Sequence, residues 1–308
     1  MSAETLSPFV VARAEVRAVE RVSPTFARIT FGGADLADFG TPGAVLDQRI
    51  KLVFPSPGHP LPVLGEGDWY SAWLAVPEGE RGTMRTYSIR DLWVDADGTR
   101  VVVDFVLHLA PGLTGPAALW ASGAEVGDEL LLVGPRRGRV GGGGIEFAPG
   151  DARRILLAGD ETAAPAIARI LEDSSPGMLG TAFLEVPHAD DALPIAAPPG
   201  FDVRWLVRGA DPHGSALIPA VLAHLGDDVA AVEIEDVDTA EPLWETPQYS
   251  GLGEPLAPAT PHADRYFWIA GESGVVTTLR RHLVKDLGVD RAQVAFMGYW
   301  RRGVAMRG

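Results

Sequence analysis

The chain has 308 residues, 46% of them hydrophobic, which is long enough for two domains with ordinary cores. Its 41 acidic and 26 basic side chains give a net charge of −15, which disfavours non-specific binding to nucleic acid or to an anionic membrane. The sequence contains no cysteine, which excludes disulfides, a thiol nucleophile and a cysteine-ligated iron–sulfur cluster.

The amino terminus, Met1-Ser2-Ala3-Glu4-Thr5, is polar and lacks the basic and apolar parts of a secretion signal. The sequence also lacks a run of about 18 apolar residues that would span a bilayer. We therefore expect a soluble, cytoplasmic protein with no nucleic-acid or membrane partner, and we expect it to be a monomer.

The first half of the chain has the pattern of an antiparallel barrel. Short alternating apolar runs, separated by glycine and proline, predict six strands at residues 9–18, 26–32, 48–54, 84–93, 100–108 and 129–134. Residues 63–83, which carry Trp69, Tyr70 and Trp73, are predicted to form an irregular insertion. A short helix is predicted to start at Gly115, with Pro116 in its first turn.

The second half alternates strands with helices, which predicts a mostly parallel sheet with helices on both faces. Strands are expected at 154–158, 181–186, 202–207, 229–234, 266–270 and 293–298, and helices at 162–172, 215–225 and 274–287. Between the halves, Gly141 to Gly144 form a run that lacks the Lys-Ser/Thr of a phosphate-binding loop. We interpret it as a flexible connection and place the domain boundary between Gly141 and Asp151.

The stretch from Met84 to Arg90 carries the chemistry around which the first half is organised. In an extended strand, Arg85 and Tyr87 point to one side, and Thr86 and Ser88 point to the other. A guanidinium and an aromatic ring on one face suit a phosphate-bearing aromatic cofactor such as a flavin.

The residues Arg85-Thr86-Tyr87-Ser88 resemble the flavin motif of ferredoxin-reductase-type barrels. With the stretches 104–108 and 296–303, the chain resembles siderophore-interacting proteins, the flavin-dependent ferric-siderophore reductases, over nearly its whole length. The resemblance implies a ferredoxin-reductase-like fold, with an antiparallel FAD-binding β-barrel at residues 8–145 and a nicotinamide-nucleotide-binding α/β domain at residues 151–308.

The resemblance also implies which residues contact FAD. The chain departs from the family pattern at Ala118, where relatives carry serine or threonine, and at Leu109, where glycine is common. For Asp104 a structural hydrogen bond, and for His108 an ordinary half-buried position, are equally open interpretations. The implied contacts are Arg85, Thr86, Tyr87, Ser88, Asp104, Val106, Leu107, His108, Gly115, Pro116 and Ala117.

Two strand ends in the second domain are candidates for an NAD(P) site. Dinucleotides bind beyond the carboxyl ends of parallel strands, where a helix amino terminus can meet phosphate, and Thr162 is expected to cap such a helix. The residues alone leave an ordinary strand-to-helix turn equally open, whereas the resemblance favours nucleotide binding. Arg208 is a candidate contact to the 2′-phosphate of NADPH, and Glu272 is either a nucleotide contact or a solvated helix charge. The implied contacts are Gly159, Asp160, Glu161, Thr162, Ala163, Arg208, Gly271 and Glu272.

Three cations, Lys51, Arg137 and Arg302, match the family's basic cluster for an anionic ferric siderophore. Each by itself is explained equally simply as a solvated charge. The seven histidines show no metal-ligand spacing, so the protein is not expected to ligate a metal itself.

The activity that the resemblance implies is electron transfer from NADH or NADPH, through FAD, to Fe(III) in a siderophore, releasing Fe(II) for iron acquisition. A ferredoxin is the alternative donor. Two other functions remain open: a general NAD(P)H:flavin or ferric-chelate reductase, and a non-catalytic siderophore-binding protein that retains the fold.

Overall fold

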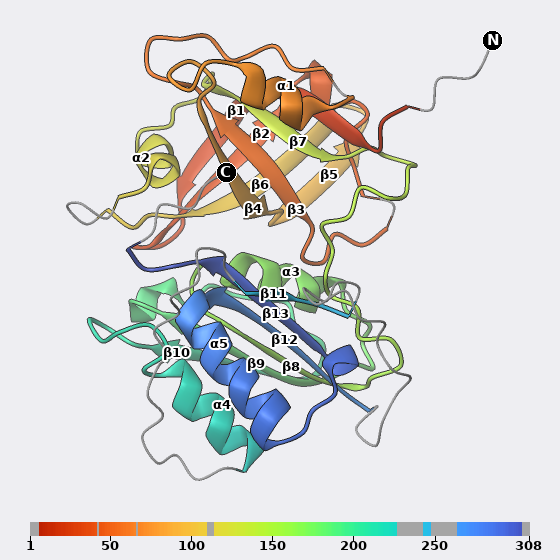
Figure 1. Cartoon of the computed structure of the whole chain (residues 1–308), viewed down its shortest axis with the longest axis vertical. Helices are drawn as coiled ribbons and strands as arrows, with labels where there is room; N and C mark the ends of the chain where they lie inside the picture. The colour runs from red at the N-terminus through yellow and green to blue at the C-terminus, as the bar shows by residue number, and fades with distance from the viewer. Residues whose placement is uncertain are drawn as a thin grey trace. The chain divides into compact units, whose positions relative to one another are not determined.

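The computed structural model describes residues 6–41, 43–65, 67–109, 114–226, 243–247 and 264–303 (Figure 1). The chain divides into two compact units, Met1–Ile145 and Glu146–Met306. The break between them falls within the predicted connection at residues 141–151. The strand predicted at 229–234 lies outside the described residues. In the part of the chain that is described, no helix is long and apolar enough to cross a membrane.

The first unit is built on one antiparallel sheet of seven strands in the order β4-β3-β7-β1-β2-β6-β5 (Figure 1). Alternate side chains of each long strand are buried, as in β1, where Val10, Ala12, Ala14 and Val16 point into the core. The strands are β1 Phe9–Arg21, β2 Phe26–Gly32, β3 Arg49–Phe54, β4 Thr83–Ser88, β5 Asp91–Asp95, β6 Gly98–Val106 and β7 Glu129–Pro135.

The strand predicted at 84–93 is wrong as a single element, because the chain changes partners in its middle. β4 pairs with β3 and β5 pairs with β6, at opposite ends of the strand order. The change occurs at Ile89, whose N–H donates to Gln48 O, and at Arg90, whose N–H donates to Val102 O. These two residues join the ends of the sheet, so the sheet closes on itself as a barrel.

Two short helices accompany the barrel, α1 Trp69–Ala75 and α2 Pro116–Ser122. The prediction of an irregular insertion at 63–83 is wrong where α1 forms: Asp68 caps the helix by accepting from Ser71 N–H, and Trp73 packs on Met84 and its neighbours. The helix predicted from Gly115 is confirmed.

The second unit is a sheet of six strands in the order β10-β9-β8-β12-β13-β11, parallel except for β11 (Figure 1). Its central strands are almost continuously buried, as in Phe267-Trp268-Ile269-Ala270 of β12, which is typical of a sheet covered on both faces. The strands are β8 Arg154–Gly159, β9 Leu179–Val186, β10 Gly200–Val207, β11 Trp244–Glu245, β12 Arg265–Glu272 and β13 Val294–Trp300.

The helices of this unit are α3 Ala164–Asp173, α4 Leu217–Leu225 and α5 Ser273–Arg281. Apolar side chains of α4 and α5, including Ile218, Val221 and Leu279, share one core with β12 and β13. The helix predicted at 274–287 continues past α5 as a π-helical turn, His282–Asp286. This arrangement brings the carboxyl ends of the neighbouring strands β8, β12 and β13 together at one edge of the sheet.

Candidate functional site

Arg85 and Tyr87 lie half-buried in β4 and next to each other on one face of the strand. The Tyr87 ring packs on Phe105, with ring centroids 4.6 Å apart, and burial raises the pKa of its phenol. The Arg85 guanidinium donates to the carbonyl of Met84 at 2.7 Å, and burial lowers the pKa of Arg85. Among the described residues, Arg85 has no carboxylate partner, so its charge is available to a ligand.

Lys51 lies on β3, directly across from Thr86 on β4, and both side chains point to the face of the sheet opposite to Arg85 and Tyr87. Its ammonium donates to the Thr86 hydroxyl at 2.8 Å. Burial and the nearby charge of Arg49 lower the pKa of Lys51. Lys51 also has no carboxylate partner within the described part of the chain. Arg85 and Lys51 are therefore partly buried cations of the barrel, and no carboxylate of the described residues neutralises either of them.

Asp104 makes a structural hydrogen bond, which was one of the two interpretations that the sequence left open. Its side chain is buried on β6, directly across from Arg28 on β2. The Arg28 guanidinium donates to both carboxylate oxygens, at 2.7 and 2.8 Å, and Arg90 lies 3.8 Å away. This bidentate pair offsets the cost of burying the charge.

The implied FAD contacts that follow β6 lie at the end of the strand and at the start of α2. β6 ends at Val106, Leu107 is buried in the core, and His108 is half-buried. Leu109 is 48% exposed. Of the remaining implied contacts, Gly115 is the extended N-cap of α2, and Pro116 and Ala117 are its first two residues. Ala118, which differs from the family pattern, is buried.

The glycine run at 141–144 packs against the start of β3. The carbonyl of Gly143 accepts from the Gln48 side chain at 3.0 Å, and the carbonyl of Gly144 accepts from Arg49 N–H at 2.8 Å. Gly144 has a φ of +91°, and a β-carbon there would lie 2.3 Å from the Gln48 amide nitrogen. This end of the run is therefore a packed connection and not the flexible one that we interpreted from the sequence.

In the second unit, Asp160 joins the ends of three strands. One carboxylate oxygen accepts from the N–H of Thr162 at 2.9 Å and from its hydroxyl at 2.5 Å. The other accepts from Glu272 N–H at 2.8 Å and from the Trp300 indole N–H at 2.9 Å. The expectation that Thr162 caps the following helix is wrong, because α3 begins at Ala164 and Thr162 donates to Asp160 instead.

Arg208 is not the exposed strand-end arginine that the sequence suggests. It is 9% exposed, and its guanidinium donates to both oxygens of Glu161, at 2.7 and 2.8 Å. Although burial opposes it, Glu161 raises the pKa of Arg208. His213 lies 3.1 Å from the same carboxylate. The Arg208 charge is thus paired inside the protein, and its contact with a 2′-phosphate stays a prediction.

Carboxylates of the chain itself occupy the amino termini of two helices at this edge. Glu272 caps α5 by accepting from the N–H groups of Gly274 and Val275, so it is not simply a solvated charge. Glu185, fully buried on β9, accepts from three N–H groups at the start of α4. Glu185 was missed in the sequence, although a charged residue inside an apolar strand is the signal that would have found it.

The three cations assigned to the substrate differ in their surroundings. Arg137 is exposed, but one of its guanidinium nitrogens donates to the carbonyls of Ala37 and Phe39 and to the Thr99 hydroxyl, at 2.9 to 3.1 Å. The barrel backbone therefore already engages Arg137. Arg302 belongs to the second unit, where its N–H donates to Glu272 at 3.3 Å and its side chain is exposed.

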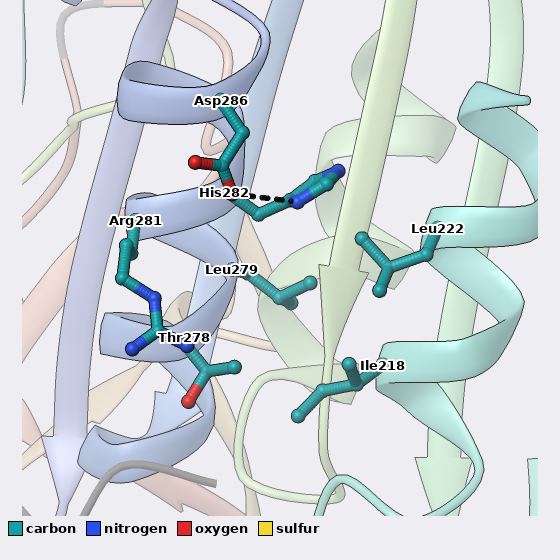
Figure 2. Close-up of a pocket in the computed structure, with 7 residues that line it drawn as sticks. All are labelled: Ile218, Leu222, Thr278, Leu279, Arg281, His282 and Asp286. Atoms are coloured by element: carbon teal, nitrogen blue, oxygen red, sulfur yellow. Dashed lines mark hydrogen bonds and ion pairs between the residues drawn. The ribbon is translucent and has the colours of Figure 1, made fainter. Parts of the chain in front are cut away.

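A small cavity of about 80 Å³ lies between α4 and α5, away from all of these residues. Figure 2 shows Ile218, Leu222 and Leu279 lining it, with His282 paired to Asp286 at 3.1 Å beside them. None of the predicted site residues contributes to this cavity.

Two family models match the chain, one to each unit. The siderophore-interacting FAD-binding domain matches residues 15–139, and the siderophore-interacting protein model matches residues 152–303. The chain belongs to the siderophore-interacting protein family. Its first unit is the family's FAD-binding domain, and its fold is the ferredoxin-reductase-like arrangement that we expected.

Curated relatives of this siderophore-interacting protein include ferric reductases. An uncharacterized protein of Mycobacterium tuberculosis is 34% identical over 94% of this chain and 89% of the relative. The ferric vibriobactin reductase ViuB of Vibrio cholerae is 30% identical over 92% of this chain and 86% of ViuB. The NADPH-dependent ferric-chelate reductase of Escherichia coli is 29% identical over 92% of this chain and 89% of that protein.

Solved structures agree with the family assignment and with the fold. A siderophore utilization protein from T. fusca superposes with a TM-score of 0.70 and 28% identity, covering 97% of this chain and 96% of that one. A ferredoxin NADP+ reductase from Neisseria gonorrhoeae superposes with a TM-score of 0.55 and 15% identity over 96% of this chain and all of that one. The second likeness shows the fold alone.

Proposed function

We propose that the protein is an FAD-dependent reductase that takes electrons from NADH or NADPH and reduces Fe(III) held in a siderophore. The observation that carries the proposal is the half-buried pair Arg85 and Tyr87, in which the guanidinium has no carboxylate partner among the described residues. Such a cation beside an aromatic ring fits the phosphate and the ring of a flavin. Membership of a family whose relatives are named ferric reductases supports the reaction.

In this proposal, Arg85 binds a flavin phosphate and Tyr87 packs against the flavin. Ser88, whose side chain points to the other side of the strand, donates its backbone N–H to the flavin ring edge. The start of α2, from Gly115 to Ala117, lies along the diphosphate. FAD supplies the conversion of a two-electron donor into single-electron steps, so that one NAD(P)H reduces two Fe(III) ions. The protein contributes binding and orientation.

Lys51 is proposed to attract the anionic chelate, because it is a partly buried cation without a protein carboxylate partner among the described residues. Reduction promotes release because Fe(II) carries less charge than Fe(III), so hard oxygen ligands hold it more weakly. The carboxylates Asp160, Glu161 and Glu272 already bind protein donors, so we propose that their backbone and neighbouring residues shape the nucleotide site.

The test is an absorbance spectrum of the purified protein, followed anaerobically by NADH, NADPH and then a ferric siderophore with a ferrous trap. We expect flavin bands that bleach with one nucleotide and return as trapped Fe(II) appears. A colourless protein that cannot be reconstituted with FAD would contradict the proposal and favour a non-catalytic siderophore-binding protein. If the flavin bleaches only with a reduced ferredoxin, the electron donor is a ferredoxin and not a nucleotide.

A titration of the flavin-free native and Arg85→Ala proteins with FAD tests the flavin assignment. Loss of a charge-assisted hydrogen bond is expected to weaken FAD binding by about 10- to 100-fold. Arg17→Ala is the matched control, because Arg17 is an exposed barrel arginine that pairs with Glu15. An Arg85→Ala protein that retains FAD as tightly as the control would contradict the role of Arg85.

A further inference from the structure

The segment Trp300–Arg302, at the carboxyl end of β13, is held by bonds from three places in the second unit. The Trp300 indole N–H donates to Asp160 at 2.9 Å, and the Ser273 hydroxyl donates to the Trp300 carbonyl at 2.9 Å. The N–H of Arg302 donates to Glu272 at 3.3 Å. The backbone that leads to the exposed Arg302 side chain is therefore fixed beyond the end of the strand.

Asp160 is the residue on which this arrangement depends most. Its side chain receives four hydrogen bonds, two on each oxygen, from Thr162, Glu272 and Trp300. A carboxylate offers about four acceptor positions, so this one has none left for a nucleotide. Burial and the charge of Glu161 raise the pKa of Asp160, whereas its donors oppose that shift by stabilising the ionised form.

The neighbouring loop is shaped to admit this carboxylate. Gly271 has a φ of +138°, and a β-carbon at that position would lie 2.7 Å from the Asp160 carboxyl carbon. Only glycine gives both this backbone conformation and this close approach. The loop after β12 can therefore bring Glu272 N–H to Asp160 while Glu272 also binds the N–H of Arg302.

The Trp300 ring is held on a second side by His213. The two ring centroids are 4.7 Å apart in an edge-to-face arrangement, and His213 is bonded to Glu161. The indole is thus fixed both by its N–H and by its ring. Of the described residues, none offers a carboxylate to the Arg302 guanidinium, which leaves that charge available to an anionic ligand.

We propose that Asp160 is a positioning residue for chelate reduction: by holding the Trp300 indole and the Glu272 loop, it fixes where Arg302 presents its guanidinium to an anionic ferric chelate. This inference rests on the proposed function, because Arg302 is assigned there to the chelate. It differs from the sequence-based expectation, in which Asp160 contacts the nucleotide.

The test is a double-mutant cycle on the FAD-loaded protein with Asp160→Asn and Arg302→Ala, using the ferric tris-catecholate complex, which carries three negative charges. Asp160→Asn keeps the shape but exchanges one acceptor oxygen for a donor. We expect the KM for the chelate to rise about fivefold in Asp160→Asn and about tenfold in Arg302→Ala. The flavin content should stay unchanged, and the kcat should change less than this KM. Because Asp160 acts through Arg302, the double variant should resemble Arg302→Ala alone.

Two further variants separate positioning from general stability. Trp300→Phe keeps an aromatic ring but removes the indole N–H, so it should raise the KM for the chelate as Asp160→Asn does. It provides the same test if Asp160→Asn folds poorly. Glu185→Gln is the matched control, because Glu185 is another buried carboxylate that binds protein N–H groups in the same unit. It should lower the Tm and leave the KM for the chelate unchanged.

Each outcome decides one question. If Arg302→Ala leaves the KM for the chelate unchanged, the assignment of Arg302 in the proposed function fails, and the positioning inference fails with it. If Arg302→Ala raises that KM but neither Asp160→Asn nor Trp300→Phe does, only the positioning inference is overturned. A general structural role for Asp160 would follow from either of two results. Asp160→Asn could raise the KM for the chelate by the same factor in the native protein and in Arg302→Ala, or Glu185→Gln could raise that KM as much as Asp160→Asn does.

Discussion

At the scale of single side chains, cations of the barrel that pair with a carboxylate differ from those that are candidates for binding a ligand. Arg28, Arg90 and Arg136 of the barrel each lie within 4 Å of a carboxylate, as Arg136 does with Asp38 at 2.7 Å. Arg85 and Lys51 have no such partner among the described residues. In a chain with a net charge of −15, partly buried cations without a carboxylate indicate an anionic ligand.

The lowered pKa of Lys51 predicts a pH dependence for chelate binding. Lysine is a cation only below its pKa, and burial and Arg49 move that pKa below the ordinary value of 10.5. The charge is therefore lost at a lower pH than for an exposed lysine, and the KM for an anionic ferric chelate should rise by about threefold as the pH rises toward 10.5.

Lys51→Arg is the control for this prediction, because an arginine stays charged throughout that pH range. The ratio of the chelate KM of the native protein to that of Lys51→Arg, measured with one chelate at each pH, removes the titration of the chelate itself. We expect the ratio to increase with pH. A ratio that is constant across the alkaline range would show that Lys51 does not contribute its charge to binding.

The sequence revealed residue types at this scale but not their partners. The Arg-x-Tyr-Ser segment was recognised because its chemistry is local. The pairing of Asp104 with Arg28 depends on strands that are distant in sequence, and that of Arg208 with Glu161 depends on the order of the parallel strands. The hydrogen bond from the Trp300 indole to Asp160 likewise needs three strand ends to meet, and the local sequence pattern does not predict that meeting.

At the scale of elements, a continuous strand pattern did not by itself define a single strand. The pattern from Met84 to Trp93 is continuous, yet the pairing partner changes from β3 to β6 at Ile89 and Arg90, because closing the barrel requires a change of partner. Helix α1 was missed although Asp68 is a helix-capping residue and Trp69 and Trp73 are four residues apart on one helix face. The surrounding proline and glycine masked that signal.

Helix α1 is expected to stabilise the barrel mainly through Trp73. This side chain is 4% exposed, its indole N–H donates to the Arg81 carbonyl at 3.0 Å, and the Arg81 guanidinium lies 4.7 Å above its ring. Trp73→Ala should lower the free energy of unfolding by about 3 to 5 kcal/mol, because it leaves a cavity beside Met84.

Thermal or urea unfolding of the barrel, followed by circular dichroism, measures this loss. Tyr70→Ala is the control from the same helix, because Tyr70 is 42% exposed and should cost less than about 1 kcal/mol. Equal destabilisation by the two substitutions would mean that α1 does not contribute through its buried face.

At the scale of the whole molecule, the two units have separate hydrophobic cores. The first core includes Ile29, Leu52 and Phe105, and the second includes Phe183, Leu279 and Phe296. The match to the FAD-binding domain model covers only the first unit. The two-part organisation was visible in the sequence because the period of its apolar residues changes near residue 151, from strand alternation to alternating strands and helices.

Separate cores predict that FAD stabilises one unfolding transition and not the other. A ligand at about 100 times its Kd stabilises the state that binds it by about 2.7 kcal/mol, which raises the Tm of a domain of this size by several degrees. Scanning calorimetry should therefore show two transitions, of which only one moves to higher temperature as FAD is added.

Core variants identify which unit each transition reports. Ile29→Ala removes buried apolar volume from the first core and should lower the FAD-sensitive transition, whereas Leu279→Ala should lower the other; both side chains are fully buried. If FAD shifts both transitions together, or if Leu279→Ala lowers the FAD-sensitive transition, the units unfold as one cooperative body. In that event the stability of the second unit depends on flavin occupancy, and a loss of FAD would destabilise both units.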